Sequence, residues 1–115
     1  MGRITLRDHA LVAANVARAK GGGILAYDPV RLYDHACVER NLAQRGGGIL
    51  FVGASLALRQ HALITDNRAG VVGGGVLARV LRHATIRVGA DAAIRGNSPQ
   101  NVTVHKVDFV RPPEA

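Results

Sequence analysis

The sequence is poor in cysteine and in aromatic residues. Cys37 is its single cysteine, and it contains two tyrosines, two phenylalanines and no tryptophan. One cysteine cannot form an intramolecular disulfide, and it excludes a zinc site built from several thiolates. A globular core normally contains a few large rings at its centre. The scarcity of rings therefore favours a thin, layered core of aliphatic side chains, because hydrophobic residues still make up 48% of the 115-residue chain.

Long hydrophobic runs and acidic residues are also scarce. The longest uncharged run, residues 46–58, is shorter than the roughly 20 residues that a transmembrane helix needs. No apolar segment follows the first basic residues, so the sequence predicts neither a membrane span nor a signal peptide. Lysine and arginine outnumber aspartate and glutamate by 15 to 8. A surface with this excess attracts polyanions such as nucleic acid, acidic polysaccharide or anionic lipid, although the bases form no continuous run.

What the sequence does contain is one motif that occurs four times. Each copy runs from an alternating apolar pair to an asparagine, and the asparagines lie 26, 26 and 30 residues apart. A glycine triplet follows the asparagine in the first three copies. The copies indicate one domain over residues 1–110, followed by an exposed tail at residues 111–115. We expect four coils, over residues 4–29, 30–55, 56–85 and 86–110.

The motif has the pattern of short strands and not of a helix. Residues 10–20 are rich in alanine and would form a helix by propensity alone. The apolar residues that open each copy alternate with other residues, as in Ile4 and Leu6 or Val30 and Leu32, and this is strand periodicity. A glycine triplet would end any helix. We therefore predict an all-β fold with about three short strands per copy, joined by tight corners.

A unit of this size cannot bury its own apolar face, but it can do so when the next copy stacks on it. Aligned residues would then lie directly above one another, on rungs about 4.8 Å apart. Four asparagines would form a ladder of amides, and the glycine that opens each triplet would allow positive φ at a corner. The predicted ladder and corner positions are Asn15, Asn41, Asn67, Asn97, Gly21, Gly46 and Gly73. The sequence therefore predicts a parallel solenoid of about four coils.

The combined pattern, h-x-h…A-x-h-x-x-N-x-A…G-G-G-I with h for a hydrophobic residue, resembles the repeats of right-handed parallel β-helix proteins. It is most similar to the repeats of the polymorphic outer-membrane protein family, and the same solenoid occurs in pectin-lyase-like proteins. The resemblance covers roughly residues 4–104. It implies a right-handed parallel β-helix and an extracellular or cell-surface location. The fourth copy departs from the family pattern, because no glycine triplet follows Asn97, and we expect it to be the closing coil.

A histidine occupies the same position in each of the first three copies. In a stack, these histidines would form a column beside two aspartates. In one alternative, Asp8, Asp34, His35 and His61 are the catalytic residues of a polysaccharide lyase or hydrolase; in another, His9, His35 and Asp34 bind a metal ion. The first and third rungs are about 10 Å apart, so a single column cannot supply three ligands to one ion. We favour a column of stacked imidazoles that belongs to the corner, with neither a catalytic nor a metal site.

Basic and aromatic residues supply the candidate binding surface. Arg7 and Arg59 would share a column with Tyr33 between them, where an arginine can stack on the ring. The third interval has four extra residues, which we expect to form a loop just before Ile86. Insertions in solenoids map to loops, and such loops often bind ligands. The candidate binding residues of this loop are Arg79, Arg82 and His83.

These features favour a non-enzymatic interaction or scaffold module. It would bind a protein partner or an acidic glycan through its faces, or associate with a partner or with itself through the open strand edges at the ends of the stack. The alternative is a polysaccharide lyase or hydrolase domain, and a basic nucleic-acid-binding module is a weaker one. We expect no cofactor, because the glycine triplets lack the Lys-Ser or Lys-Thr of a phosphate loop and lead into strands.

Overall fold

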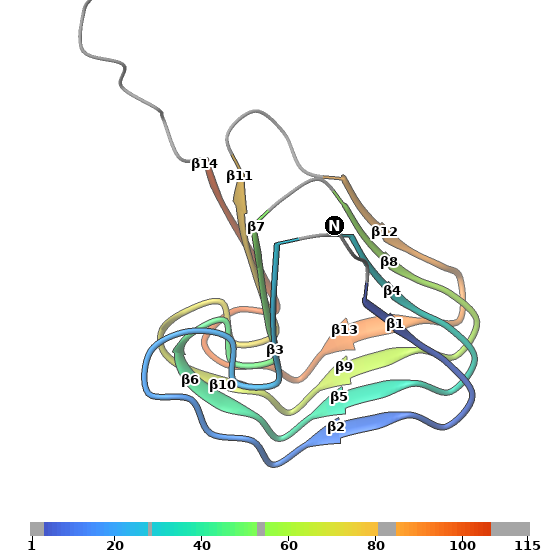
Figure 1. Ribbon diagram of the computed structural model, residues 1–115, viewed down its shortest axis with the longest axis horizontal. Coiled ribbons are helices and arrows are strands. Elements are labelled where there is room, and N and C mark those ends of the chain that lie inside the picture. Colours follow the sequence, from blue (N-terminus) through green and yellow to red (C-terminus); the bar gives the residue numbers. More distant parts are fainter. Residues whose placement is uncertain (1–3, 28, 53–54, 81–84, 107–115) are drawn as a thin grey trace, which may run out of the picture.

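The structure, a computed structural model, describes residues 4–27, 29–52, 55–80 and 85–106. The chain winds through four coils that lie flat on one another, and each coil contributes one strand to each of three parallel sheets (Figure 1). The predicted all-β, right-handed parallel solenoid of about four coils is confirmed. The described residues contain no helix, even in the alanine-rich residues 10–20, and so no helix among them could cross a membrane.

The first strand of each coil belongs to sheet 1, which contains β1 (Ile4–Leu6), β4 (Val30–Leu32), β8 (Ser55–Leu58) and β12 (Thr85–Val88). The second belongs to sheet 2, which contains β2 (Leu11–Ala13), β5 (Cys37–Glu39), β9 (Leu63–Thr65) and β13 (Ala93–Arg95). The third belongs to sheet 3, which contains β3 (Ile24–Ala26), β7 (Ile49–Val52), β11 (Val76–Val80) and β14 (Val102–Lys106). Between sheets 2 and 3 the chain forms two further strands that pair with each other, β6 (Leu42–Arg45) and β10 (Arg68–Val72).

The core consists of aliphatic layers enclosed by the three sheets. Its residues are the alternate positions of the strands, so that Ile4 pairs with Val30 and Val30 pairs with Leu56 along one inward column. Val30 and Leu56 are completely buried. Phe51 of β7 is the one large ring among the described core residues, which agrees with a thin core that repeats from coil to coil. Burial of each such side chain contributes about 2 kcal/mol.

Asparagine side chains join the coils beside this core. The Oδ1 of Asn67 accepts hydrogen bonds from the backbone N–H and the Nδ2 of Asn41, at 3.0 and 2.9 Å. The Nδ2 of Asn67 donates to Asn97 Oδ1 at 2.9 Å and to the Val38 carbonyl at 3.0 Å. Asn15 begins the ladder by donating to Asn41 in the same way. Asn41 and Asn67 are each only 1% exposed, so these bonds replace water for the buried amides.

Asn101 ends the ladder inside the last coil. Both the backbone N–H and the Nδ2 of Asn97 donate to Asn101 Oδ1, at 3.0 and 3.1 Å. In the preceding coil, the backbone N–H and the Nδ2 of Asn67 donate to Asn97 in the same way. Asn101 therefore supplies the acceptor that a fifth coil would supply, which explains how the fourth copy can close the stack without a glycine triplet.

A lobe projects beyond the three sheets, between sheets 2 and 3 (Figure 1). It consists of residues 16–20, 42–45, 68–72 and 98–100. Gly46 and Gly73, with φ of +65° and +68°, turn the chain from the lobe into sheet 3. Leu50 and Leu77 alternate with inward residues of β7 and β11, so they point toward the lobe, where they are completely covered. The lobe thus has a small apolar interior of its own.

The extra residues of the third interval are divided between two places. Relative to the preceding interval, one falls in β10, where the register with β6 shifts between Ala69 and Val72. The others precede β12. Arg79 lies in β11, where it pairs with Val52, so the prediction that it belongs to a loop was wrong. The reason is that the ladder between β7 and β11 extends further than the glycine spacing indicated. Residues 81–84, with Arg82 and His83, and the tail at residues 111–115 lie outside the described residues.

Candidate functional site

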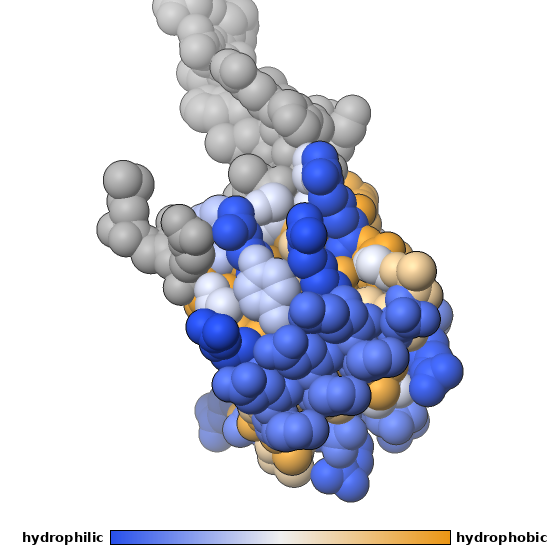
Figure 2. Space-filling model, turned by 90° about the vertical axis from the view of Figure 1, so that its right-hand side faces the viewer, coloured by the Kyte–Doolittle hydropathy of each residue, from blue (hydrophilic) through white to orange (hydrophobic). Residues whose placement is uncertain are grey.

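The outer face of sheet 1 carries a column of residues one position away from the buried ones. The strand register aligns Arg31 of β4 with Ala57 of β8, and Ala57 with Arg87 of β12. Arg31 lies between Val30 and Leu32, which are completely buried, so its side chain points outward. Figure 2 shows that the side formed by sheet 1 and the corner after it is predominantly hydrophilic.

A second column lies where the strands of sheet 1 end. It contains Arg7, Tyr33 and Arg59, and backbone bonds fix its register: Tyr33 N–H donates to the Leu6 carbonyl at 2.8 Å, and Arg59 N–H donates to the Leu32 carbonyl at 2.9 Å. The sequence therefore placed these three candidates on one surface correctly.

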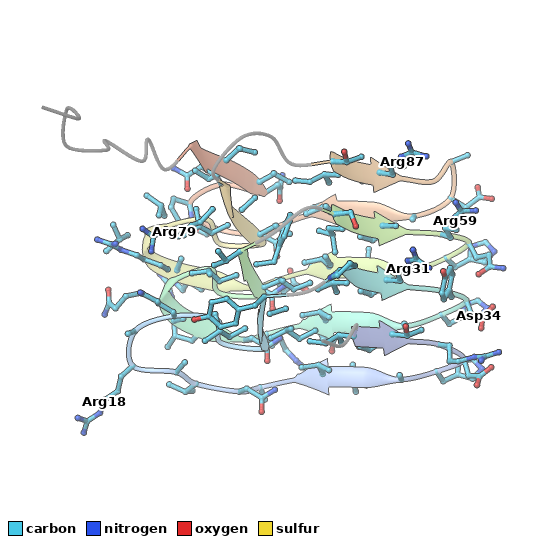
Figure 3. The ribbon with its side chains drawn as sticks, turned by 45° about the horizontal axis from the view of Figure 1, so that its top comes forward. Arg18, Arg31, Asp34, Arg59, Arg79 and Arg87 are labelled. Atoms are coloured by element: carbon cyan, nitrogen blue, oxygen red, sulfur yellow. The ribbon has the colours of Figure 1, made fainter. Side chains whose placement is uncertain are left out.

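The two columns combine to give one arginine on each of the four coils, beginning with Arg7 on the first coil. Arg31, Arg59 and Arg87 lie on the second, third and fourth coils, on the same side of the stack (Figure 3). Adjacent rungs of a parallel ladder are about 4.8 Å apart, so the three backbone positions rise along the solenoid axis in steps of that size. Arg31 and Arg87 were missed by sequence reasoning because their column also contains a threonine and an alanine. The alternation of buried and exposed residues was the signal that could have found them.

The surface between these side chains is hollowed. A hollow of about 350 Å³ is lined by Arg31, Tyr33, Arg59 and Arg87, together with residues of β8 and β12. A second hollow shares Tyr33 and continues toward the first coil, where Arg7 lines it. A third shares Arg59 and Arg87 and continues around the corner of the fourth coil. Each hollow shares lining residues with the other two, and their linings together come from all four coils. We call the surface that the three hollows form the arginine groove.

The arginines of the groove form no salt bridge with any side chain that the structure describes. Among the side chains that the structure describes, the one salt bridge joins Arg40 to Glu39, at 3.0 Å. The arginines of the groove therefore have no carboxylate partner among the described residues. Asp34 is the one carboxylate in the lining of the groove, near its first-coil end. Several guanidinium groups on neighbouring rungs, facing one acid, create a local field that attracts anions.

The histidine column lies at the corner between sheets 1 and 2. The ring centroids of His9 and His35 are 5.1 Å apart, those of His35 and His61 are 5.0 Å apart, and the planes differ by only 11° and 9°. All three rings are exposed. Among the described residues, no group of three or more His, Cys, Asp or Glu side chains is arranged to hold a metal ion. In particular, the structure does not assemble a metal site from His9, His35 and Asp34.

The column that contains Asp8, Asp34 and Gln60 stabilises the backbone of the same corner. Asp34 Oδ2 accepts a hydrogen bond from the Asp8 N–H at 3.0 Å, and Gln60 Oε1 accepts one from the Asp34 N–H at 2.7 Å. Asp8, Asp34 and Gln60 all have positive φ, of 59°, 58° and 59°. Aspartate tolerates this left-handed conformation better than most residues. The carboxylate of Asp34 thus holds the corner of the preceding coil.

Cys37 on β5 is not an activated nucleophile. Its Sγ donates to Glu39 Oε1 at 3.3 Å. Burial, the hydrogen bond to Glu39 and the charge of that carboxylate raise the pKa of the Cys37 thiol to about 12, although Arg40 acts in the opposite direction. The residue therefore stays a neutral thiol at physiological pH, whereas nucleophilic cysteines depend on a lowered pKa.

The remaining basic candidate of the sequence lies elsewhere. Figure 3 shows Arg79 on the opposite side of the solenoid from Arg31, Arg59 and Arg87. It is therefore not part of the arginine groove.

No family model, curated protein or solved structure matches this chain. The function must therefore be inferred from the geometry and charges of the chain itself.

Proposed function

We propose that this protein is a non-enzymatic binding module and that its arginine groove binds an acidic polysaccharide. The observation that carries the proposal is the placement of Arg31, Arg59 and Arg87 on three successive coils without a carboxylate partner among the described residues. A row of cations along a groove fits an extended polymer with repeated anionic groups. A small anion would contact one or two of these arginines and leave the rest unused.

The composition of the groove favours a polysaccharide over a nucleic acid. Proteins that bind single-stranded nucleic acids combine basic grooves with several aromatic side chains on which the bases stack. Tyr33 is the one aromatic ring in the groove lining. Sulfate and carboxylate groups of a glycan need only the charged forks of arginine, which bind such groups through two parallel hydrogen bonds.

The repeat pattern supports the same proposal. It is similar to the repeats of the polymorphic outer-membrane protein family and of pectin-lyase-like proteins. Proteins with this type of solenoid include adhesins and polysaccharide-active enzymes. On this basis we propose a location at the cell surface or outside the cell, where acidic glycans are available.

The arrangement offers less support to the lyase or hydrolase alternative. The carboxylate of Asp34 is already engaged by the Asp8 N–H, and His35 stacks between His9 and His61. A glycosidase needs two carboxyl groups that face one glycosidic bond from opposite sides. Here Asp8 and Asp34 lie on adjacent rungs of one column, and the Asp34 carboxylate accepts a hydrogen bond from the corner backbone.

The test compares two double variants that remove the same charge. We expect heparin, a sulfated polysaccharide, to bind the wild-type protein in isothermal titration calorimetry. Arg59→Gln/Arg87→Gln should weaken binding by about tenfold or more, since two charged contacts are lost. The slope of log Kd against log salt should fall by about 1 for each lost contact. The control Arg40→Gln/Arg95→Gln should change Kd by about twofold at most, because both residues lie away from the groove.

Two results would contradict the proposal. If both double variants weaken heparin binding equally, the interaction is a general effect of net charge and the groove has no special part in it. If the wild-type protein binds neither heparin nor polygalacturonate at low salt, an acidic polysaccharide is not its ligand.

A further inference from the structure

We propose that the lobe is a second binding surface for acidic polysaccharide, so that one protein molecule bridges two polymer chains. Four basic residues of the lobe are exposed: Arg18, Lys20, Arg45 and Arg68. The lobe segments contain no aspartate or glutamate. None of the four residues forms a salt bridge with a described side chain. The lobe therefore has the same uncompensated positive charge as the arginine groove, on different strands.

The strand register holds like charges together in the lobe. Lys20 and Arg45 are direct partners in a parallel β-bridge between the first and second coils. Aligned residues of neighbouring parallel strands lie on rungs about 4.8 Å apart, so the two positive charges repel each other. A bound sulfate or carboxylate would remove this repulsion. An anion should therefore bind more favourably beside Lys20 and Arg45 than beside an isolated lysine, because it also removes the repulsion between the two charges.

The lobe is a fixed scaffold for these charges. Ala17 N–H donates to the Leu42 carbonyl at 2.8 Å, and Arg45 N–H donates to the Ala19 carbonyl at 2.9 Å. Leu50 is completely buried beneath the lobe. A polymer that binds here would not have to order a flexible loop, so less conformational entropy would be lost on binding.

The lobe and the arginine groove face different directions. Figure 3 shows Arg18 on one side of the solenoid and Arg31, Arg59 and Arg87 on the other. Sheet 2 and its two corners lie between them. Apart from the arginines of the groove, this surface carries five acidic residues against two basic ones, Arg40 and Arg95; the acidic residues are Asp8, Asp34, Glu39, Asp66 and Asp91. An anionic chain is repelled by this intervening surface. A chain bound in the groove is therefore not expected to continue onto the lobe, and each surface would take its own chain.

The lobe site does not depend on the groove, but the bridging of two chains rests on the proposed function of the groove. The test uses Lys20→Gln/Arg45→Gln and Arg59→Gln/Arg87→Gln, which remove equal charge. We expect calorimetry with a heparin hexasaccharide to give two bound molecules per wild-type protein and one per molecule of either variant. Long heparin should form light-scattering aggregates with the wild-type protein only. Thermal unfolding of Lys20→Gln/Arg45→Gln should occur at the wild-type temperature or above it, because a repulsive pair is removed.

The outcomes separate the two sites. If Lys20→Gln/Arg45→Gln keeps the wild-type stoichiometry and light scattering, the lobe is not a binding surface, and the proposal for the groove is unaffected. The lobe proposal also fails if the wild-type protein binds one hexasaccharide and only Arg59→Gln/Arg87→Gln abolishes this binding. If instead only Lys20→Gln/Arg45→Gln abolishes the binding of that hexasaccharide, the proposal for the lobe is supported and the proposed function of the groove fails.

Discussion

At the scale of the residue, the buried asparagines have the strictest requirements. The side chain of Asn67 accepts two hydrogen bonds and donates two, so its amide is fully used. Aspartate has no N–H to donate, and alanine has neither group. A buried polar group that loses its partner costs about 1 to 3 kcal/mol. Neighbouring coils are therefore joined by a side chain that no other residue type can replace without loss.

We predict that Asn67→Ala lowers the free energy of unfolding by about 3 kcal/mol, because it removes the acceptor of the buried Asn41 backbone N–H, one hydrogen bond of Asn41 Nδ2 and one donor to the Val38 carbonyl. Asn15→Ala should cost about 1 kcal/mol or less, since Asn15 is exposed at the end of the ladder and water can replace it. Urea denaturation measures both values. Equal losses for the two variants would contradict the view that the ladder stabilises the fold through its buried members.

At the scale of the element, the corner that leads into sheet 3 depends on close backbone contact between coils. A Cβ at Gly48 would lie 2.6 Å from the Gly75 carbonyl oxygen and 2.8 Å from Asn67 Nδ2. The first neighbour is a backbone atom, and the second belongs to a buried amide that its hydrogen bonds hold in place. The third glycine of each triplet is therefore needed for space, whereas the first, such as Gly46, is needed for its positive φ.

We predict that Gly48→Ala destabilises the protein by about 3 kcal/mol or more, because the coils would have to separate at this corner. Gly89→Ala is the matched control. A Cβ there would lie 3.3 Å from its nearest neighbour, the Leu58 carbonyl oxygen, so we expect a loss of about 1 kcal/mol at most. Thermal unfolding followed by circular dichroism compares the two. A Gly48→Ala protein as stable as Gly89→Ala would show that the corner is not tightly packed.

At the scale of the whole molecule, the coil is the unit of construction. Each coil contacts only the coils above and below it, and stability is the sum of these interfaces. The second coil, residues 30–55, has the same length as the spacing between Asn15 and Asn41. If it were removed, Ile4 would face Leu56 and Asn15 would face Asn67, in the register that already exists between their present partners.

We predict that deletion of residues 30–55 gives a folded solenoid of three coils with a lower urea midpoint, because one coil interface is lost. Deletion of residues 30–42 is the control. It removes the sheet 1 and sheet 2 strands of a coil but leaves its sheet 3 strand, so it should not unfold cooperatively. The far-ultraviolet circular dichroism spectrum and the cooperativity of unfolding are the measurements. Failure of the whole-coil deletion to fold, with β content lost, would contradict the independence of the coils.

The repetition explains why so much of the fold could be predicted. Any flat stacking of equal copies brings equal positions together, so the Asn15 ladder and the His9 column follow from their spacing alone. The same reasoning could not place Arg79, because an insertion interrupts the copy in which it lies. The role of Asn101 could not be predicted from the repeat either. Asn101 acts through a contact four residues back along the chain, which no other copy contains.

The sequence by itself determined the coil, its length and the order of its columns, because a 26-residue unit can bury its apolar face only against another copy of itself. The tertiary structure alone decided on which side of the solenoid the segments beyond each corner lie. The φ angles at each corner and the number of residues between corners set the direction of the next strand. They leave Arg18 and Arg79 on the opposite side of the solenoid from the arginine groove, whose two columns are neighbours through the alternation along the strands of sheet 1.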